Sequence, residues 1–380
     1  MDDAVARPRQ RRRVRVAVTP DILIVGAGVI GLSVARELKR REPPRRIVVI
    51  DREPRIAMHA SGRNSGVLHA GFYYSPDSLK ARFTRTGNAL MTAYCSERKL
   101  PIRRCGKLVV ATSPEELPRL DELHRRGLAN GVTLEMLDAQ SARAIEPRAR
   151  IFERAIWSPS TSTVDPLQVM ESLLRDARDE GIDVQLATAY DKQPAGFVVN
   201  AAGLGAVAIA RRFGLAQHYR MLPFRGAYLY SSEPPDSFRT HLYPVPDPRF
   251  PFLGVHFTIT VDGRAKIGPT AMPSLRHGAM LLATHPELRS HAWAELRKRS
   301  RRQMVKLAAR LADNVRASDY RTWGTPGIRA QLYDTRRRAL EMDFVLERGE
   351  RSLHILNAVS PGFTCAMSFA EYVADAVLTK

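Results

Sequence analysis

The feature that most constrains the fold is a glycine-rich turn between an apolar strand and a helix. Asp21–Val25 is a short apolar run that leads directly into the sequence GAGVIG at residues 26–31. Helical spacing follows over residues 30–41, a proline pair ends it, and Ile47–Ile50 is a second apolar run. This order predicts a strand, turn, helix and strand, the unit from which parallel α/β sheets are built.

Each glycine of the turn has a physical reason. Gly26 permits the tight turn, Gly28 lets the backbone approach a pyrophosphate, and Gly31 allows close packing of the helix on the strand. The start of the helix offers free N–H groups and a positive dipole end to the phosphates. Asp51 ends the second strand, where a carboxylate accepts hydrogen bonds from ribose hydroxyls and repels a 2′-phosphate. We therefore predict a dinucleotide site that disfavours NADP.

Three further segments bear on whether that dinucleotide is NAD or FAD. Residues 61–74 read SGRNSGVLHAGFYY, residues 198–203 read VVNAAG, and residues 357–362 read NAVSPG. Small residues of this kind recur where a backbone passes close to a flat or charged group. If all of these turns reach the same sheet, the cofactor is long and enclosed, which favours FAD. A glycine-rich loop without a ligand is the alternative for residues 61–74.

Composition and charge argue against several other classes. The chain of 380 residues is 44% hydrophobic and 26% charged, as expected for a globular protein. Its formal net charge of +20 comes from scattered arginines without a nucleic-acid-binding motif, so we expect no nucleic-acid partner. Three dispersed cysteines form neither a disulfide framework nor a metal site, and we expect no metal. The longest apolar run is too short to span a bilayer, and a cytoplasmic location is expected.

Two basic segments leave a relation to membranes open. Residues 1–17 are rich in arginine but open with Asp2 and Asp3, which favours a solvated tail over a cleaved mitochondrial presequence. Residues 287–315 are expected to form a basic helix that contains the run RKRSRR at 297–302. This run is either a solvated charged face or a site for peripheral docking on anionic lipid at the inner face of a membrane.

The rest of the chain alternates between two architectures. Helices are predicted over 78–99, 114–130, 166–180 and 366–378, and strands over 107–111, 132–137, 183–187, 197–200 and 352–356. Between 222 and 268, alternation with frequent Pro and Gly predicts antiparallel strands. We expect an α/β fold with two interleaved domains. A Rossmann-type cofactor domain would take residues 18–98, 160–216 and 322–380, and a mixed or antiparallel-sheet substrate domain residues 99–159 and 217–321.

Over most of its length the sequence resembles the L-2-hydroxyglutarate dehydrogenase and oxidase family, within the D-amino-acid-oxidase-like FAD superfamily. The resemblance rests on long segments, among them ILIVGAGVIGLSVARELKRR, SGRNSGVLHAGFYYSPDSLKARF, CGKLVVAT, LPFRGAY, YPVPDPRFPFLGVHFT, PGIRAQL and LHILNAVSP. It implies an FAD-binding Rossmann-type domain beside a mixed-sheet substrate domain. It also implies oxidation of L-2-hydroxyglutarate to 2-oxoglutarate. A quinone and O₂ are both candidates for the electron acceptor, and the sequence does not choose between them.

Oxidation of a 2-hydroxy acid needs a hydride acceptor, a base for the hydroxyl proton and a cation for the carboxylate. Arg329 is the expected carboxylate anchor because a planar guanidinium binds a carboxylate bidentately, although a surface arginine is the alternative. His69 and His256 compete as the base, since the pKa of histidine lies near working pH. Either histidine can instead be structural.

Further residues are expected around the cofactor and the substrate. Those expected at the cofactor are Gly26, Gly28, Gly31, Asp51, Arg52, Arg63, Asn64, Ser65, Gly66, Ala202, Gly203, Ser360, Pro361, Gly362, Phe363 and Thr364. Substrate candidates are Arg225 for a second carboxylate, Lys80 as a nearby cation, and Tyr73, Tyr74 and Tyr243 as hydrogen-bonding groups.

Departures from the family pattern keep two alternatives open. The connection between Val184 and Val198 is short where family members have a β-hairpin, and the stretch after Pro273 is also shortened. The C-terminal motif reads NAVSPGFTCAM, whereas the family is commonly NAPSPAAT-like. An amine or amino-acid oxidase of the same superfamily and a flavoprotein without catalytic activity therefore remain alternatives. Cys365 is expected to be a small buried thiol rather than a covalent link to flavin.

Overall fold

The computed structural model describes residues 19–247, 253–273 and 300–379. One half of the molecule is built on a six-stranded sheet with the strand order β20-β21-β10-β1-β2-β9. β1 (Ile22–Val25) lies inside the sheet and pairs in parallel with β2 (Ile47–Ile50) and β10 (Phe197–Asn200). With α1 (Val29–Arg41) between β1 and β2, the predicted strand–turn–helix–strand unit is confirmed.

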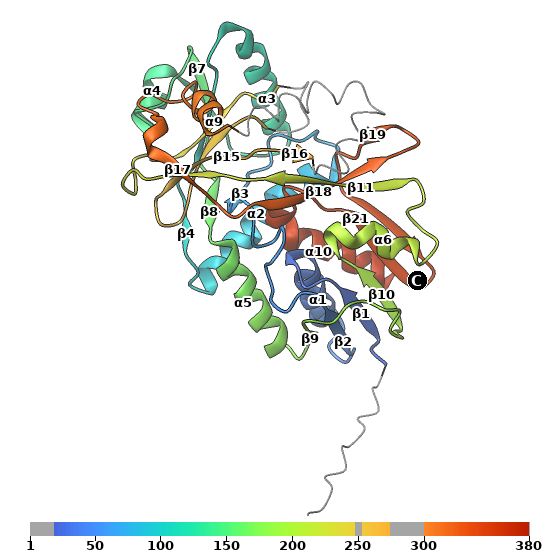
Figure 1. Ribbon diagram of the computed structural model, residues 1–380. Helices are drawn as coiled ribbons and strands as arrows, with labels where there is room; N and C mark the ends of the chain where they lie inside the picture. The colour runs from blue at the N-terminus through green and yellow to red at the C-terminus, as the bar shows by residue number, and fades with distance from the viewer. Residues whose placement is uncertain (1–18, 248–252, 274–299, 380) are drawn as a thin grey trace, which may run out of the picture.

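The outer strands of this sheet come from distant parts of the chain. β9 (Asp183–Gln185) continues the parallel pairing beyond β2, and β21 (Ser352–Asn357) continues it beyond β10. β20 (Val345–Gly349) closes that side in the antiparallel direction. The N-terminal, middle and C-terminal segments therefore build one sheet together (Figure 1).

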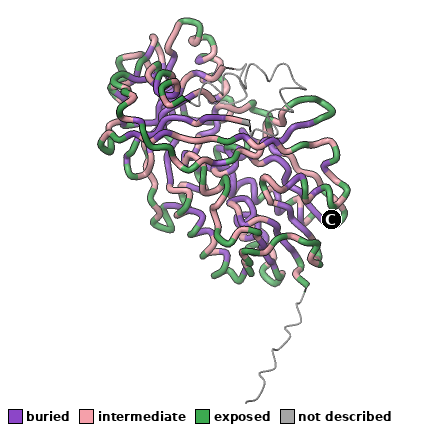
Figure 2. The backbone as a smooth tube through the Cα atoms, in the orientation of Figure 1, coloured by how far each residue is buried: buried purple, intermediate pink, exposed green. Residues whose placement is uncertain are grey.

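Both faces of the six-stranded sheet are covered at its centre, which explains why β1 and β2 are continuously apolar. Ile22 and Ile24 pack into a large cluster with four helices, which are α1, α2 (Leu79–Glu97), α5 (Pro166–Asp179) and α10 (Gly362–Leu378). Leu23 and Val25 face the other side of the sheet. They are covered there by residues from the segments before and after β10, which include α6 (Ala206–Arg211). Burial runs through both halves of the molecule (Figure 2).

The second half is an eight-stranded, mostly antiparallel sheet with the order β17-β12-β15-β14-β13-β5-β7-β6. In chain order its strands are β5 (Lys107–Val110), β6 (Glu135–Asp138), β7 (Arg154–Ser158), β12 (Leu229–Ser231), β13 (His241–Pro244), β14 (His256–Ile259), β15 (Ala265–Gly268) and β17 (Tyr320–Trp323). A short 3-10 turn (Pro114–Glu116) followed by α3 (Leu117–Ala129), then α4 (Ala139–Ile145) and α9 (Arg301–Ala308), lie on this half (Figure 1).

Two smaller sheets connect the halves. β11 (Tyr219–Gly226) pairs antiparallel with β18 (Gly327–Asp334) over their full length, and β16 (Met272–Pro273) and β19 (Ala339–Leu340) flank them. The other sheet has the order β3 (Val67–Leu68), β8 (Ser162–Val164) and β4 (Ile102–Arg103). Because β11 and β18 come from different predicted domains, the division into two domains stays a prediction.

The α/β architecture is confirmed, whereas three element boundaries were wrong. The strand predicted over 132–137 lies at Glu135–Asp138, because Val132 and Leu134 pack into a hydrophobic cluster before pairing with β7 begins. The last helix begins at Gly362 rather than at 366, since the carbonyl of Pro361 already accepts a helical hydrogen bond.

The third boundary belongs to the predicted basic helix at 287–315, whose residues before 300 lie outside the described residues. Its described part is α9, which ends at Ala308. The chain then turns so that Ala312 forms a β-bridge with Ala149, which excludes a helix to residue 315. Of the run RKRSRR, only residues 300–302 are described. Among the described residues, no helix combines the length and the apolar character needed to cross a membrane.

Candidate active site

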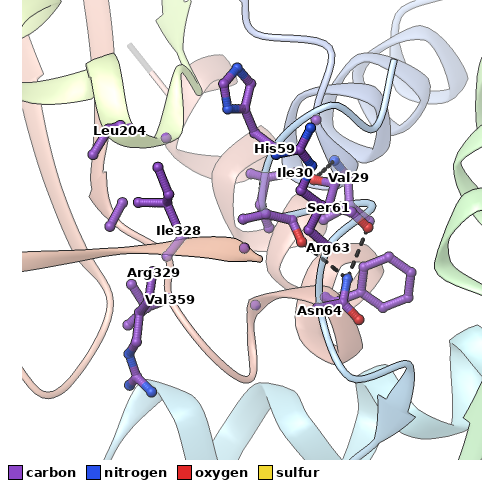
Figure 3. Close-up of a pocket in the computed structure, with 18 of the residues that line it drawn as sticks. Val29, Ile30, His59, Ser61, Arg63, Asn64, Leu204, Ile328, Arg329 and Val359 are labelled. Atoms are coloured by element: carbon purple, nitrogen blue, oxygen red, sulfur yellow. Dashed lines mark hydrogen bonds between the residues drawn. The ribbon is translucent and has the colours of Figure 1, made fainter. Parts of the chain in front are cut away.

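A cavity of about 610 Å³ lies between the two halves, next to the carboxyl ends of β1, β2 and β10. Gly26, Gly28 and Asp51 line it on the parallel-sheet side, and Tyr243 and His256 line it on the side of the eight-stranded sheet. Figure 3 shows the loop that carries Ser61, Arg63 and Asn64 on one side and β18 with Ile328 and Arg329 on the other. This volume is typical of pockets that enclose small molecules.

The glycine turn leaves room only for backbone. Gly26 has a φ of +111°, and a Cβ atom there would lie 2.5 Å from the carbonyl oxygen of Ala201. A Cβ atom at Gly31 would lie 1.9 Å from the carbonyl oxygen of Gly26. Gly26 and Gly28 line the cavity, whereas Gly31 does not, in keeping with its expected packing role.

The start of α1 and the end of β2 provide polar groups at this end of the cavity. Gly28 begins α1 without a side-chain cap, and the first turn of the helix has no acidic residue. Asp51 Oδ2 accepts a hydrogen bond from the Ala27 N–H at 2.8 Å, and Oδ1 accepts one from the Glu53 N–H at 2.9 Å. Each carboxylate oxygen keeps further acceptor capacity for ribose hydroxyls.

The loop after β2 is held by its own hydrogen bonds. Asn64 Nδ2 donates to the carbonyl of Ser61 at 2.9 Å, and Asn64 Oδ1 accepts from the Gly66 N–H at 2.8 Å. Ser61 Oγ accepts from the Val29 N–H at 3.0 Å, which fastens the loop to the start of α1 (Figure 3). Ser61 therefore belongs to the site although the sequence did not single it out; its place at the head of the glycine-rich loop was the available signal.

Most residues expected at the cofactor line this one cavity. They are Gly26, Gly28, Asp51, Arg52, Arg63, Asn64, Ser65, Ala202, Gly203, Ser360, Pro361, Gly362, Phe363 and Thr364. Gly66 does not line it; its φ is +78°, and a Cβ there would lie 2.5 Å from the carbonyl of Val164. The bare glycine turn, the start of α1 and the carboxylate at the strand end together fit an adenine dinucleotide.

At the opposite end of the cavity, the tautomer of His256 is defined by its hydrogen bond. Its ring stacks on Tyr243 with centroids 3.9 Å apart, and its Nδ1 lies 2.7 Å from the carbonyl oxygen of Gly254. Because a carbonyl only accepts, Nδ1 carries the proton, so Nε2 is the basic nitrogen when the ring is neutral. His256 can therefore act as a proton acceptor.

His69 also lines the cavity but is held differently. Its backbone N–H donates to Thr364 Oγ1 at 3.2 Å, and its Nδ1 is buried with no hydrogen-bond partner among the described residues. Burial lowers the pKa of His69 well below its usual value, and the charges of Lys107 and His256 act in the same direction. The ring is therefore neutral near pH 7.

Arg329 lines the cavity from β18, and its Nε donates to Gln331 Oε1 at 3.3 Å. Burial lowers the pKa of Arg329 to about 10, against the raising effect of Tyr74 and Tyr228. Lys80 does not line the cavity; it is only 3% exposed, with its ammonium 5.8 Å from the centre of the Tyr74 ring. Burial, followed by the charge of Arg329, lowers the pKa of Lys80 to about 8. Both groups remain cations at neutral pH.

Of the remaining substrate candidates, only one lines the cavity. Tyr243 lines the cavity, whereas Tyr73 and Tyr74 are packed behind its wall. Arg225 is exposed, and its neighbour Phe224 on β11 faces the cavity instead, because alternate residues of a strand point to opposite faces. The structure thus does not bring Arg225 into the site. Tyr228 lines the cavity and was not singled out from the sequence.

Comparison with known proteins places the chain in a family. The family model described as FAD dependent oxidoreductase matches residues 21–376. The "L-2-hydroxyglutarate dehydrogenase, mitochondrial" of Nematostella vectensis is 36% identical, over 93% of this chain and 90% of that protein. The chain belongs to the L-2-hydroxyglutarate dehydrogenase family of FAD-dependent oxidoreductases. The human relative of the same name is 34% identical, over 94% of this chain and 88% of that protein.

This L-2-hydroxyglutarate dehydrogenase family member is thus an oxidoreductase with FAD as its cofactor. The "L-2-hydroxyglutarate dehydrogenase" of Escherichia coli is 29% identical, over 94% of this chain and 93% of that protein. Among solved structures, L-alpha-glycerophosphate oxidase from Mycoplasma pneumoniae aligns with a TM-score of 0.77 at 20% identity, over 95% of both chains. Glycine oxidase from Geobacillus kaustophilus aligns with a TM-score of 0.74 at 20% identity, over 94% of both chains. These structures share the fold.

Proposed function

We propose that the protein oxidises L-2-hydroxyglutarate to 2-oxoglutarate. The observation that carries the proposal is the continuity of one cavity, which has the dinucleotide-binding turn at one end and His256 and Arg329 at the other. The relatives that the chain resembles over nearly its whole length carry the name of this activity. The glycine turn, Asp51 and the loop at residues 61–66 would hold FAD, which when bound accepts a hydride.

Substrate binding is assigned to the buried cations. Arg329 would bind the carboxylate next to the hydroxyl group, since its planar guanidinium forms two parallel hydrogen bonds with a carboxylate and thereby fixes Cα. A five-carbon diacid carries a second carboxylate. Lys80 lies outside the lining of the cavity and is proposed to attract that carboxylate through its charge, which also acts on Arg329.

Proton removal is assigned to His256. The substrate loses a proton from its hydroxyl group and a hydride from Cα, which together convert the C–OH group into a carbonyl. Nε2 of His256 would take the proton, because the bond from Nδ1 to Gly254 fixes the tautomer that leaves Nε2 basic. His69 is the second candidate, as it also lines the cavity in its neutral form.

The electron acceptor and the location belong to the same proposal. A quinone or O₂ would reoxidise the cofactor, and the protein would be cytoplasmic with peripheral attachment to anionic membranes. Oxygen uptake with and without a water-soluble quinone analogue separates the two acceptors. Co-sedimentation with anionic vesicles tests the attachment, which is ruled out if the protein does not pellet with the vesicles at moderate salt.

The activity is tested by an anaerobic substrate panel read at the visible absorbance of the flavin. We expect L-2-hydroxyglutarate to bleach the flavin within the time of mixing, and D-2-hydroxyglutarate to leave it unchanged. Bleaching by glycine, sarcosine or a D-amino acid instead would identify an amine or amino-acid oxidase. Bound flavin that none of these compounds bleaches would identify a non-catalytic flavoprotein and overturn the proposal.

A further inference from the structure

Lys107 is a buried cation that the proposed chemistry does not use. It is the first residue of β5, it is 0% exposed, and its Nζ has no hydrogen-bond partner among the described residues. Three aromatic rings surround the ammonium instead, with centroids 4.5 Å away for Phe72, 4.6 Å for Tyr73 and 4.8 Å for Tyr243. Burying an ammonium without a carboxylate is costly, so an apolar residue would be the expected occupant.

One ring of this cage belongs to the wall of the cavity. Tyr243 contacts the ammonium of Lys107 and also stacks on His256 at 3.9 Å. His69, on the loop that supplies Phe72 and Tyr73 to the cage, lies near enough for the charge of Lys107 to affect its protonation. Lys107 therefore lies one ring behind His256 in the cavity wall.

The ionisable groups around Lys107 come from several elements, and none of those identified is a carboxylate. The loop between β3 and α2 supplies His69 and Tyr73. β13 supplies His241, which lies opposite Lys107, and Tyr243, and β14 supplies His256. On its other side, β7 places Ser158 opposite Lys107.

The helix that packs on the same face of the sheet also leaves the charge of Lys107 uncompensated. α3 contributes Leu120 and Leu123 to the cluster that contains Phe72 and Tyr243. Its acidic residues, Asp121 and Glu122, are engaged in ion pairs with arginines, namely Arg154, Arg125 and Arg126.

We propose that Lys107 is a positioning residue for proton removal, whose ammonium disfavours protonation of the histidines in the cavity wall and so keeps the base ready to accept a proton. The inference rests on the proposed function, because it assigns Lys107 a part in the same oxidation. A positive charge close to an imidazole lowers the pKa of that imidazole, and the effect is strong where water is excluded.

The charge of Lys107 itself depends on pH in the range that matters. Burial lowers the pKa of Lys107 to about 7. The ammonium form therefore dominates below about pH 7, where the histidines would otherwise begin to gain protons. Above that pH, Lys107 is neutral and its influence on the histidines fades. The effect of removing the charge should consequently be confined to the acidic side of the pH profile.

The test replaces Lys107 by methionine, which has a similar length and no charge. For Lys107→Met we expect the acidic limb of the kcat/KM profile to move up by about one pH unit, so that kcat/KM on that limb falls by up to about tenfold. At pH 8 the variant should match the wild type. Lys306→Met, which removes an exposed lysine on α9, should leave the whole profile unchanged.

Two outcomes would overturn the inference. Either an unchanged acidic limb, or an equal loss of kcat/KM at pH 6 and pH 8, would assign Lys107 a packing role alone. If Lys107→Met does not fold, Lys107→Gln keeps a neutral polar group in the cage and takes its place.

A second measurement separates this inference from the proposed function. Histidine resonances titrated by NMR, with His69 and His256 assigned from their Gln variants, should show higher midpoints in Lys107→Met than in the wild type. Unchanged midpoints would overturn the inference whether or not the enzyme oxidises L-2-hydroxyglutarate. A wild type that the hydroxy acid does not reduce would overturn the proposed function alone.

Discussion

Arg329 and Arg225 lie on adjacent strands in different surroundings. Residue 225 pairs with residue 328 across the β11–β18 ladder, so the two arginines are near neighbours in the sheet. Arg329 lines the cavity, where burial lowers its pKa, whereas Arg225 is exposed. Two arginines in similar sequence settings are thus distinguished by the face of the sheet from which each side chain projects.

Replacing each arginine by lysine tests the proposed role of Arg329. Arg329→Lys keeps the charge but loses the planar fork, so we expect the second-order rate of flavin reduction by L-2-hydroxyglutarate to fall about 10- to 100-fold, with FAD still bound. Arg225→Lys is the matched control and should react like the wild type. Stopped-flow reduction measures both variants. A larger loss in Arg225→Lys than in Arg329→Lys would exchange their roles.

Single residues also show what the sequence does and does not reveal about the site. The glycines at 26 and 28 and Asp51 could be predicted because local backbone geometry dictates their identities. Lys107 was visible as a charge at the start of an apolar run, but its aromatic cage draws on Phe72 and Tyr243, which lie far away in the chain. Spacing along one strand carries no information about such neighbours.

At the level of elements, local signals located the long helices well, missed the short helices α4 and α6, and predicted the strand pairs poorly. The helix predicted over 166–180 is α5, which ends at Asp179. It could be predicted because its cap, the proline in its first turn and the glycine that follows it are all local features of the sequence. β7 and β8 were missed. The segment of β18 drew notice only through PGIRAQL, one of the sequences that carry the family resemblance, since its pairing with β11 joins segments about 100 residues apart and depends on tertiary packing.

The cap of α5 gives a prediction about stability. Asp165 Oδ1 accepts hydrogen bonds from the Leu167 N–H at 2.9 Å and the Gln168 N–H at 3.4 Å. Asp165→Ala should lower the free energy of unfolding by about 1 kcal/mol, because these helix N–H groups lose their partner. Asp179→Ala, at the exposed last residue of the same helix, is the control. Urea unfolding followed by circular dichroism measures both, and equal losses would contradict the capping argument.

At the scale of the whole molecule, the cavity makes the cofactor part of the contact between the two halves. Its lining comes from the six-stranded sheet, the eight-stranded sheet and β18. Any ligand that binds only the folded chain stabilises it by an amount set by its concentration and affinity. FAD should therefore stabilise both halves together and not the parallel sheet alone.

Removal of FAD tests this expectation. The apoprotein should melt at a lower temperature, and FAD at about 1,000 times its Kd should restore about 4 kcal/mol of stability. In Asp51→Ala the melting temperature should rise only at higher FAD concentrations than in the wild type, because the carboxylate is proposed to hold the ribose. Thermal scans with probes in each half provide the measurement. A wild-type melting temperature that FAD does not raise would contradict binding of FAD between the two halves.

The strand order of the parallel sheet also has a consequence for biosynthesis. β10 is flanked by β1, made near the beginning of the chain, and by β21, which ends at Asn357. Until β21 and α10 have been made and released from the ribosome, β10 has an unpaired edge and the start of α10 is missing from the cavity wall. The cofactor site is therefore completed only after about 150 further residues have followed β10, and until then the nascent chain displays a sheet edge to which chaperones or other strands can bind.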